Sequence, residues 1–238
     1  FSNGKSMGHG AELLAMQAGV TREESDQYAE RSHRVAVKAS RDGIFAEDLV
    51  SVHVPPKSTP ITEDDGPRED ATFENLSKLK PAFDKQFGIS TAGSSSFLTD
   101  GASAVLLMSW QVALERGYTP KAIIRDYVYS AGDALRDMLS GPALSIPHLL
   151  KRNGLRVQDI DVWEIHEAFA AQVVANIKLI KDKSFARDRL GFDEAMGEIP
   201  LEKVNIWGGS LSLGHPFGAT GGRLLYTAAK RLFKSEAR

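Results

Sequence analysis

The stretch Gly208-Gly-Ser-Leu-Ser-Leu-Gly-His-Pro-Phe-Gly-Ala-Thr-Gly-Gly222 holds six of the 21 glycines of the chain. Glycine tolerates positive φ and close backbone approach, so this density predicts tight turns beside something that the chain almost touches. Leu211 and Leu213 alternate with serines, which predicts a short strand. Apolar residues then recur at helical spacing over 222–233, with polar residues on the other face. The expected order is strand, glycine loop, helix.

His215 is the one titratable side chain in this stretch. A helix N-terminus disfavours a protonated imidazole, so we expect His215 to be neutral and able to accept a proton. A phosphate-binding loop is a second interpretation, but neither the GxGxxG order nor the GxxxxGK[ST] order is present. A third is that the glycines serve packing alone and that His215 is an ordinary loop residue. The stretch by itself leaves this third interpretation open.

Composition limits the classes of function. The chain of 238 residues carries 29 basic and 31 acidic side chains, a net charge of -2. There is therefore no global field to attract nucleic acid or a membrane surface, and no apolar run reaches the roughly 18 residues of a transmembrane segment. The chain has no cysteine, which excludes disulfides, thiolate metal sites and a cysteine nucleophile within these residues. The six histidines lack metal-ligand spacing, so we expect no metal.

The remaining elements predict an α/β fold. A helix over 6–20 precedes a capping box, Thr21 to Glu24, that begins a second helix to about residue 42. Residues 50–54 read as a strand with His53 on its surface, 55–75 as an exposed loop, and 102–108 as a strand buried on both faces. Further helices are expected over 109–116, 142–153 and from His166, with strands over 122–130 and 159–165. This alternation predicts a mainly parallel or mixed sheet with helical cover, which the charged residues 181–203 interrupt.

A second candidate site is His166-Glu-Ala-Phe169, which follows the predicted strand 159–165. The next residues are apolar on most of a helical circumference, so that helix should be buried. In open α/β sheets functional residues lie at the carboxyl ends of strands, where His166 is expected. The alternative is a capping histidine that hydrogen-bonds only to the backbone.

Three segments together resemble successive signatures of the thiolase family, in the right order. They are Thr91-Ala-Gly-Ser-Ser-Ser-Phe-Leu-Thr-Asp-Gly101, His166-Glu-Ala-Phe169 and Gly214-His-Pro-Phe-Gly-Ala-Thr-Gly221. Leu79-Lys-Pro-Ala-Phe83 and Ser6-Met-Gly8 also fit, so the resemblance covers essentially the whole chain. Most thiolases have Asn where His166 stands. The histidine, with the extra residues 181–203, is similar to thiolases of the trifunctional fatty-acid β-oxidation type.

The resemblance implies a fold and a reaction. The family fold is a five-layered αβαβα core of two α/β halves with helical layers on mixed sheets, plus an inserted loop domain. Residues 1–97 would be the later part of the loop domain, and 98–238 most of the C-terminal α/β domain without its final strands. The implied reaction is thiolytic cleavage of 3-ketoacyl-CoA by CoA, which needs no further cofactor. His215 would assist thiolate formation and hold the thioester oxygen, and His166 would orient a water.

The resemblance also implies substrate contacts and partners. Ser96 matches a serine near the pantetheine of CoA, and Met7 and Phe169 match apolar residues at the acyl end. We expect a homodimer and a partner subunit with hydratase and dehydrogenase activities. The expected location is the mitochondrial matrix, with the peroxisome, the glyoxysome or the bacterial cytoplasm as alternatives.

The chain departs from the family because both thiolase cysteines are missing. The nucleophile is expected upstream of Phe1 and the acid/base downstream of Arg238, so the sequence resembles an interior fragment that is inactive alone. The start, which has neither Met nor a signal-peptide order, fits that interpretation. One alternative is a non-catalytic thiolase-like protein for acyl-CoA binding or assembly. The other is a biosynthetic acetoacetyl-CoA thiolase.

Overall fold

The computed structural model describes residues 4–56 and 59–235. Within these ranges the longer helices are α1 (Met7–Gln17), α2 (Arg22–Arg41), α5 (Gly141–Arg152), α6 (Ala170–Ile180) and α9 (Phe217–Ser235). Shorter turns of helix are α3 (Phe73–Ser77), η1 (Ala92–Ser94), α4 (Trp110–Glu115), η2 (Val157–Asp159), α7 (Lys183–Phe185), η3 (Ala186–Leu190), η4 (Leu201–Lys203) and α8 (Ser210–Leu213). Within the same ranges, extended backbone pairs only in isolated bridges: Val52 with Ile61, Pro81 with Thr91, Ser95 with Phe169, and Trp163 with Val204.

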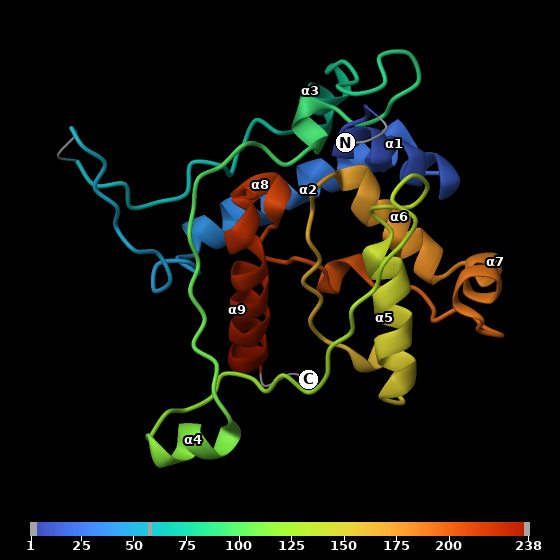
Figure 1. Ribbon diagram of the computed structural model, residues 1–238. Helices are drawn as coiled ribbons and strands as arrows, with labels where there is room; N and C mark the ends of the chain where they lie inside the picture. Colours follow the sequence, from blue (N-terminus) through green and yellow to red (C-terminus); the bar gives the residue numbers. More distant parts are fainter. Residues whose placement is uncertain (1–3, 57–58, 236–238) are drawn as a thin grey trace.

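The centre of the molecule is α6, which packs against α1, α2 and α5 (Figure 1). Its sequence is apolar on nearly every side, so burial of the whole helix is favourable. Ala171 and Ala175 have no exposed surface, and their small side chains form one cluster with Leu14 of α1. Val173 belongs to the larger core cluster that reaches α2, α5 and η3. Helix α6 is thus buried as expected.

The predicted capping box of α2 is confirmed. The Thr21 side chain accepts from the backbone N–H of Glu24 at 3.1 Å, and the Glu24 carboxylate accepts from the backbone N–H of Thr21 at 2.8 Å. These two bonds satisfy N–H groups that a helix start leaves unpaired. At the other end Gly43 has φ +69, and α2 stops two residues before it, as expected of a glycine after a helix.

The predicted strands over 102–108 and 122–130 are not formed within the described residues. Both segments are extended and lead to and from α4, which lies apart from the other helices (Figure 1). A strand exists only where a second segment pairs with its N–H and C=O groups, and neither segment has such a ladder among the described residues. Their apolar side chains are largely exposed: Leu106 at 70% and Ile123 at 69%. The expectation of burial on both faces is wrong here.

Three further expectations also need correction. Residues 50–54 and 159–165 each contribute a single bridge, at Val52 and Trp163, in place of a strand. The Ser-Leu alternation at 210–213 forms one turn of helix, α8, between Gly209 and Gly214, because four residues of that pattern fit either period. Helix α6 begins at Ala170, with Phe169 still extended, so His166 does not start it. The surface position of His53 is confirmed.

Residues 181–203, which interrupt the predicted alternation of strands and helices, contribute to the core. Phe185, Phe192 and Ile199 from this segment are buried in the main core cluster. Phe185 ends α7, while Phe192 and Ile199 lie between η3 and η4, so no single period reveals the three residues. The segment is therefore part of the core that supports α5 and α6.

The inner side of α9 is polar. Lys230 is buried and donates to the Ile44 carbonyl and the Asp48 carboxylate, both at 2.6 Å. Arg231 is also buried and forms an ion pair with the buried Glu164. Phe233, on the apolar face, is 52% exposed. The sequence predicts a helix here from about residue 222, whereas α9 begins at Phe217 and includes Gly218, Gly221 and Gly222 of the predicted glycine loop. The sequence also places these basic residues on an outer face, because periodicity does not reveal a buried carboxylate that pairs with a cation.

Candidate active site

The structure brings His166 and His215 together. Their ring centroids are 4.1 Å apart and the ring planes are tilted by 42°. His166 lies in the extended segment between the Trp163 bridge to Val204 and the start of α6. His215 follows α8 directly and precedes α9. Residues almost fifty positions apart in the sequence thus form one pair of imidazoles.

The His166 ring contacts a hydroxyl group, and a guanidinium contacts that hydroxyl. Its Nδ1 lies 2.8 Å from the Ser210 hydroxyl, and Arg223 Nη2 donates to the same hydroxyl at 3.0 Å. Burial first, and then the neighbouring His215 and the Arg223 cation, lower the pKa of His166 to about 4. The His166 imidazole is therefore neutral at neutral pH.

His215 is fixed by residues on both sides of it in the sequence. Its Nδ1 lies 2.7 Å from the Thr220 hydroxyl, and its backbone N–H donates to the Thr99 hydroxyl at 3.3 Å. Gly214 has φ +91 and a Cβ there would overlap Thr99, so glycine is required before the histidine. Burial, followed by the charge of Arg223, lowers the pKa of His215. The expected neutral state thus follows mainly from burial.

Glu167 follows His166 in the sequence, but its side chain is buried in the protein core. Its carboxylate is fully buried and accepts from Tyr28 at 2.8 Å and Ser32 at 2.7 Å. Asn205 donates to it at 2.7 Å, and the backbone N–H of Leu211 at 3.3 Å. These donors come from α2, from the segment before α8 and from α8 itself, and a carboxylate with such partners is stable without water. Glu167 therefore fixes the backbone that presents His166.

An open cavity of about 670 Å³ lies next to His215. One wall is the extended segment 98–103. The other is His215, Pro216 and the start of α9 at Phe217. The Phe217 ring is 4.9 Å from the His215 ring and is largely exposed. Ser103 donates to the Ala219 carbonyl at 2.6 Å, which joins the two walls. The cavity has room for part of a small molecule beside the His215 imidazole.

The other predicted site residues lie on neighbouring elements. The backbone N–H of Ser96 donates to the Ala168 carbonyl at 2.9 Å, between His166 and α6. Phe169 is buried and packs edge-on against Phe83, with ring centroids 5.5 Å apart. Met7 is the half-buried first residue of α1, and a side chain on the next residue, Gly8, would overlap the Phe83 ring. Ser96, Phe169 and Met7 thus surround one corner of the helical body.

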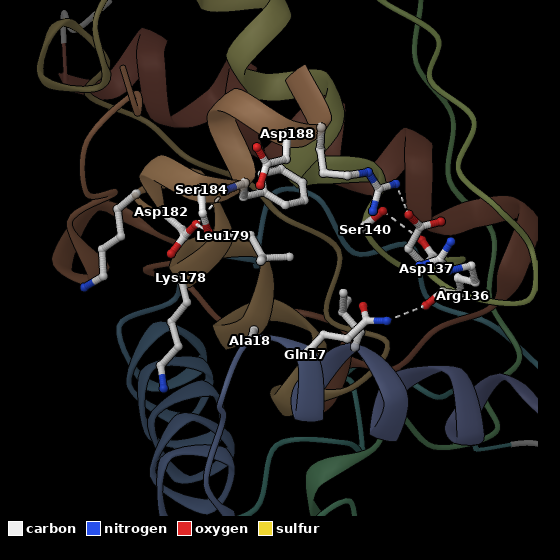
Figure 2. Close-up of a pocket in the computed structure, with 14 residues that line it drawn as sticks. Gln17, Ala18, Arg136, Asp137, Ser140, Lys178, Leu179, Asp182, Ser184 and Asp188 are labelled. Carbon is white, nitrogen blue, oxygen red and sulfur yellow. Dashed lines mark hydrogen bonds and ion pairs between the residues drawn. The ribbon is translucent and has the colours of Figure 1, made fainter. Parts of the chain in front are cut away.

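A second cavity, of about 780 Å³, has neither imidazole among its lining residues. Figure 2 shows this cavity with the side chains that line it. It lies between the end of α1, the end of α6 and the segment 136–140, where Gln17 donates to the Arg136 carbonyl at 3.1 Å. Its charged side chains include an ion pair of Arg189 with the buried Asp137. Lys178 is likewise paired with Glu24 outside the cavity at 2.7 Å. The charged side chains named here thus have ion-pair partners, inside or outside the cavity. The imidazole pair is the better candidate site.

Within residues 4–56 and 59–235, no group of three potential ligand side chains could hold a metal ion. Over the same residues, no helix combines the length and the apolar character that crossing a bilayer requires.

Sequence reasoning identified both imidazoles but missed the side chains that hold them. Thr220 is a hydroxyl in the glycine-rich stretch, and its short spacing to His215 is a signal that the sequence offers. Ser210 lies in the same stretch but contacts His166, which is distant in sequence. Arg223 was expected on the outer face of its helix, yet it reaches Ser210. Glu167 carries no sequence signal of its own role, because its partners are spread over α2, α8 and Asn205.

Comparisons with known proteins match both halves of the chain. The model of the thiolase N-terminal domain matches residues 1–111, and that of the thiolase C-terminal domain matches residues 118–238. The mitochondrial trifunctional enzyme subunit beta of Bos taurus is 49% identical over 98% of this chain and 49% of its own length. A probable 3-ketoacyl-CoA thiolase of Caenorhabditis elegans is 47% identical over 98% of this chain and 52% of its own length. The chain spans about half the length of the curated relatives it matches.

The backbone agrees as well. The crystal structure of the Bacillus anthracis acetyl-CoA acetyltransferase superposes with a TM-score of 0.84 at 36% identity, over 98% of this chain and 55% of that one. The acetyl-CoA acetyltransferase of Syntrophomonas wolfei gives 0.82 at 34% identity, over 98% and 56%. The fold is therefore thiolase-like α/β. With both family models matched and the histidine pair assembled, the chain belongs to the thiolase family.

Proposed function

We propose that this chain supplies the histidine-bearing part of an acetyl-CoA C-acyltransferase. The reaction is the cleavage of a 3-ketoacyl-CoA by CoA, which gives acetyl-CoA and a shortened acyl-CoA in fatty-acid β-oxidation. The observation that carries the proposal is the pair of neutral imidazoles, His166 and His215, of which His215 lines an open cavity. The identity of 49% to a trifunctional enzyme subunit beta supports the same reaction.

The chemistry fits two neutral imidazoles. A thiolate attacks the 3-keto carbon, the bond between C2 and C3 breaks, and the departing carbanion of acetyl-CoA takes a proton. CoA then releases the shortened acyl group from sulfur. His215 accepts the thiol proton at Nε2, because its Nδ1 faces the Thr220 hydroxyl, and the N–H so formed then donates to the thioester oxygen. His166 orients the water of the same oxyanion site.

The substrates are CoA and acyl-CoA, and the proposal includes no resident cofactor. Ser96 contacts the pantetheine of CoA, while Met7 and Phe169 line the acyl end. Their common corner of the helical body, next to the segment that carries His166, supports these roles. The chain has no cysteine, so the reacting thiolate comes from outside these 238 residues.

The proposal extends to organisation. Residues 1–97 form the later part of the loop domain, and 98–238 most of the C-terminal α/β domain. The protein works as a homodimer in the mitochondrial matrix, together with a subunit that carries hydratase and dehydrogenase activities. The similarity to a mitochondrial trifunctional enzyme subunit supports both the location and the partner.

The test is acetyl-CoA release from a 3-ketoacyl-CoA and CoA by the full-length protein. We expect His215→Ala to lower kcat about 100-fold or more, the range of a lost acid/base group. The 238-residue chain alone should give no turnover, because it has no thiol. The control is His53→Ala, an exposed histidine outside the site, which should keep full activity. Normal thiolysis by His215→Ala, or turnover by the 238-residue chain, would contradict the proposal.

Acetyl-CoA acetyltransferase activity is the second candidate, since two solved structures with that title share the fold. Their identity of 34% and 36% is lower than the 49% shared with the trifunctional subunit. Comparison of long and short 3-ketoacyl-CoA as substrates of the full-length protein separates the two. A preference for acetoacetyl-CoA alone would favour the second candidate.

A further inference from the structure

The side chains behind His166 form a directed chain of hydrogen bonds. Arg223 Nη2 lies 3.0 Å from the Ser210 hydroxyl, which lies 2.8 Å from His166 Nδ1. A guanidinium has five N–H groups and no acceptor, so Ser210 must accept from Arg223. The direction of the first bond is therefore settled by chemistry alone.

The second bond follows from burial. Ser210 has no exposed surface, and its hydroxyl hydrogen needs an acceptor because buried polar groups are almost always paired. The Nδ1 of His166 is the acceptor at hydrogen-bond distance from that hydroxyl. If Nδ1 carried the imidazole hydrogen, two donors would face Ser210 and the hydroxyl hydrogen would have no partner. Ser210 therefore donates to Nδ1, and the imidazole hydrogen is on Nε2.

We propose that Ser210 and Arg223 are positioning residues that fix the tautomer of His166 with its hydrogen on Nε2. The inference rests on the proposed function, because that tautomer gives His166 the donor it needs toward an oxyanion-site water. The Nε2 atom is on the side of the ring away from Ser210, so the donor is not used up by this hydroxyl. A buried hydroxyl without a partner is costly enough that we expect at least about a tenfold excess of this tautomer.

His215 provides an internal contrast. Its Nδ1 also faces a hydroxyl, that of Thr220 at 2.7 Å. The guanidinium of Arg223, however, bonds to Ser210 and not to Thr220. The direction of the Thr220 bond is therefore not set by a donor-only group. Because a donor-only group sets the hydrogen-bond direction at Ser210 but not at Thr220, it fixes the tautomer of His166 and leaves that of His215 open. Only His166 should therefore respond to changes at Ser210.

The test is nitrogen NMR of the chain with labelled histidines, which distinguishes protonated from bare ring nitrogens and does not depend on catalysis. In the unchanged chain we expect His166 to carry its hydrogen on Nε2. Ser210→Ala should shift His166 toward a mixture, and so should Arg223→Met, which keeps the stem but removes the donors. Arg223→Lys restores a donor and should restore the Nε2 tautomer. Arg223→Met also covers the case in which Ser210→Ala fails to fold.

The matched control is Ser212→Ala. Ser212 is a buried hydroxyl on the same turn of helix, bonded to Ser32 at 3.0 Å. Its loss should leave the His166 tautomer unchanged. A hydrogen on Nδ1 in the unchanged chain, or no change in Ser210→Ala and Arg223→Met, would overturn the proposal. In the full-length protein Ser210→Ala should lower kcat about tenfold with little change in KM. The tautomer result stands even if thiolysis is not the reaction.

Discussion

The segment that carries His166 and the segment 98–108 are both extended, yet their surroundings differ. The first is enclosed by α2, α8 and α9, and its neighbour Glu167 accepts four hydrogen bonds. The second has no strand partner among the described residues, and Leu98 is 96% exposed. Thr99 of the second segment accepts from the backbone of His215, whose ring lies against that of His166, so His215 connects the two regions. The geometry of the imidazole pair thus depends on the helical body, while one wall of the cavity depends on the exposed segment.

The largest effect is expected at Glu167. Glu167→Ala removes the common acceptor of Tyr28, Ser32 and Asn205, which are all buried, and leaves the Tyr28 hydroxyl without its partner. We expect the free energy of unfolding to fall by about 4 kcal/mol, as for other broken buried charge networks. Denaturant titration of the chain measures it.

The control for that variant is Glu198→Ala, which breaks an exposed ion pair with Lys181. Exposed pairs contribute little, so we expect a change below about 0.5 kcal/mol. Equal losses in Glu167→Ala and Glu198→Ala would mean that the segment of His166 is no better fixed than the surface.

The next effect is a pH dependence at His166. Its folded pKa is about 4 against an ordinary value of 6.5, so the unfolded chain binds a proton first as the pH falls. The stability from the neutral imidazole is present above pH 6.5 and is lost as the pH falls toward 4. The loss is about 3 kcal/mol.

His166→Asn has no titrating group at this position, so its stability should lack this component. The measurement is the free energy of unfolding of both chains across this pH range. The difference between them should change by about 3 kcal/mol toward the acidic end, in favour of the variant. Parallel pH profiles would show that His166 is not enclosed.

A smaller effect is expected where the two regions meet. Gly214→Ala forces a side chain into a residue with φ +91 and against Thr99. We expect a loss of about 2 kcal/mol. Gly218 is the matched control, because it lies in α9 with open space around it, and Gly218→Ala should stabilise by up to about 1 kcal/mol. Thermal unfolding of both variants measures the contrast, and losses of similar size would contradict it.

The smallest effect is expected in the exposed segment. Leu106 is 70% exposed, so Leu106→Ala should change the stability of the chain by less than about 0.5 kcal/mol. Leu211 of α8 is 1% exposed, and Leu211→Ala should cost about 3 kcal/mol by denaturant titration. A large loss in Leu106→Ala would show that 102–108 is packed in solution, and would remove the contrast between the regions.

Features that depend on local chemistry could be predicted from the sequence. The capping box of Thr21 and the glycine after α2 specify the second helix within a few residues. The helices α4 and α5 are also expected within a few residues of their bounds, whereas α9 begins at Phe217, earlier than the expected 222. The two imidazoles were identified by motifs, and the structure brings them to 4.1 Å.

Features that depend on distant partners could not be predicted. Leu106 has the neighbours of a buried strand residue in sequence, but burial needs a second segment, which the described residues do not provide. Lys230 and Arg231 look like an outer face until Asp48 and Glu164 are placed opposite them. The Ser210 and Arg223 pair behind His166 is hidden for the same reason, because it joins two helices.

The most direct test of the account follows the ring resonances of His166 and His215 by NMR while the chain is acidified. We expect both imidazoles to be neutral at neutral pH, His166 to titrate near pH 4, and His215 to titrate below its ordinary pKa of 6.5. If both rings instead took up protons near pH 6.5 and independently of each other, they would not form an enclosed pair, and the acid/base role given to them would be contradicted.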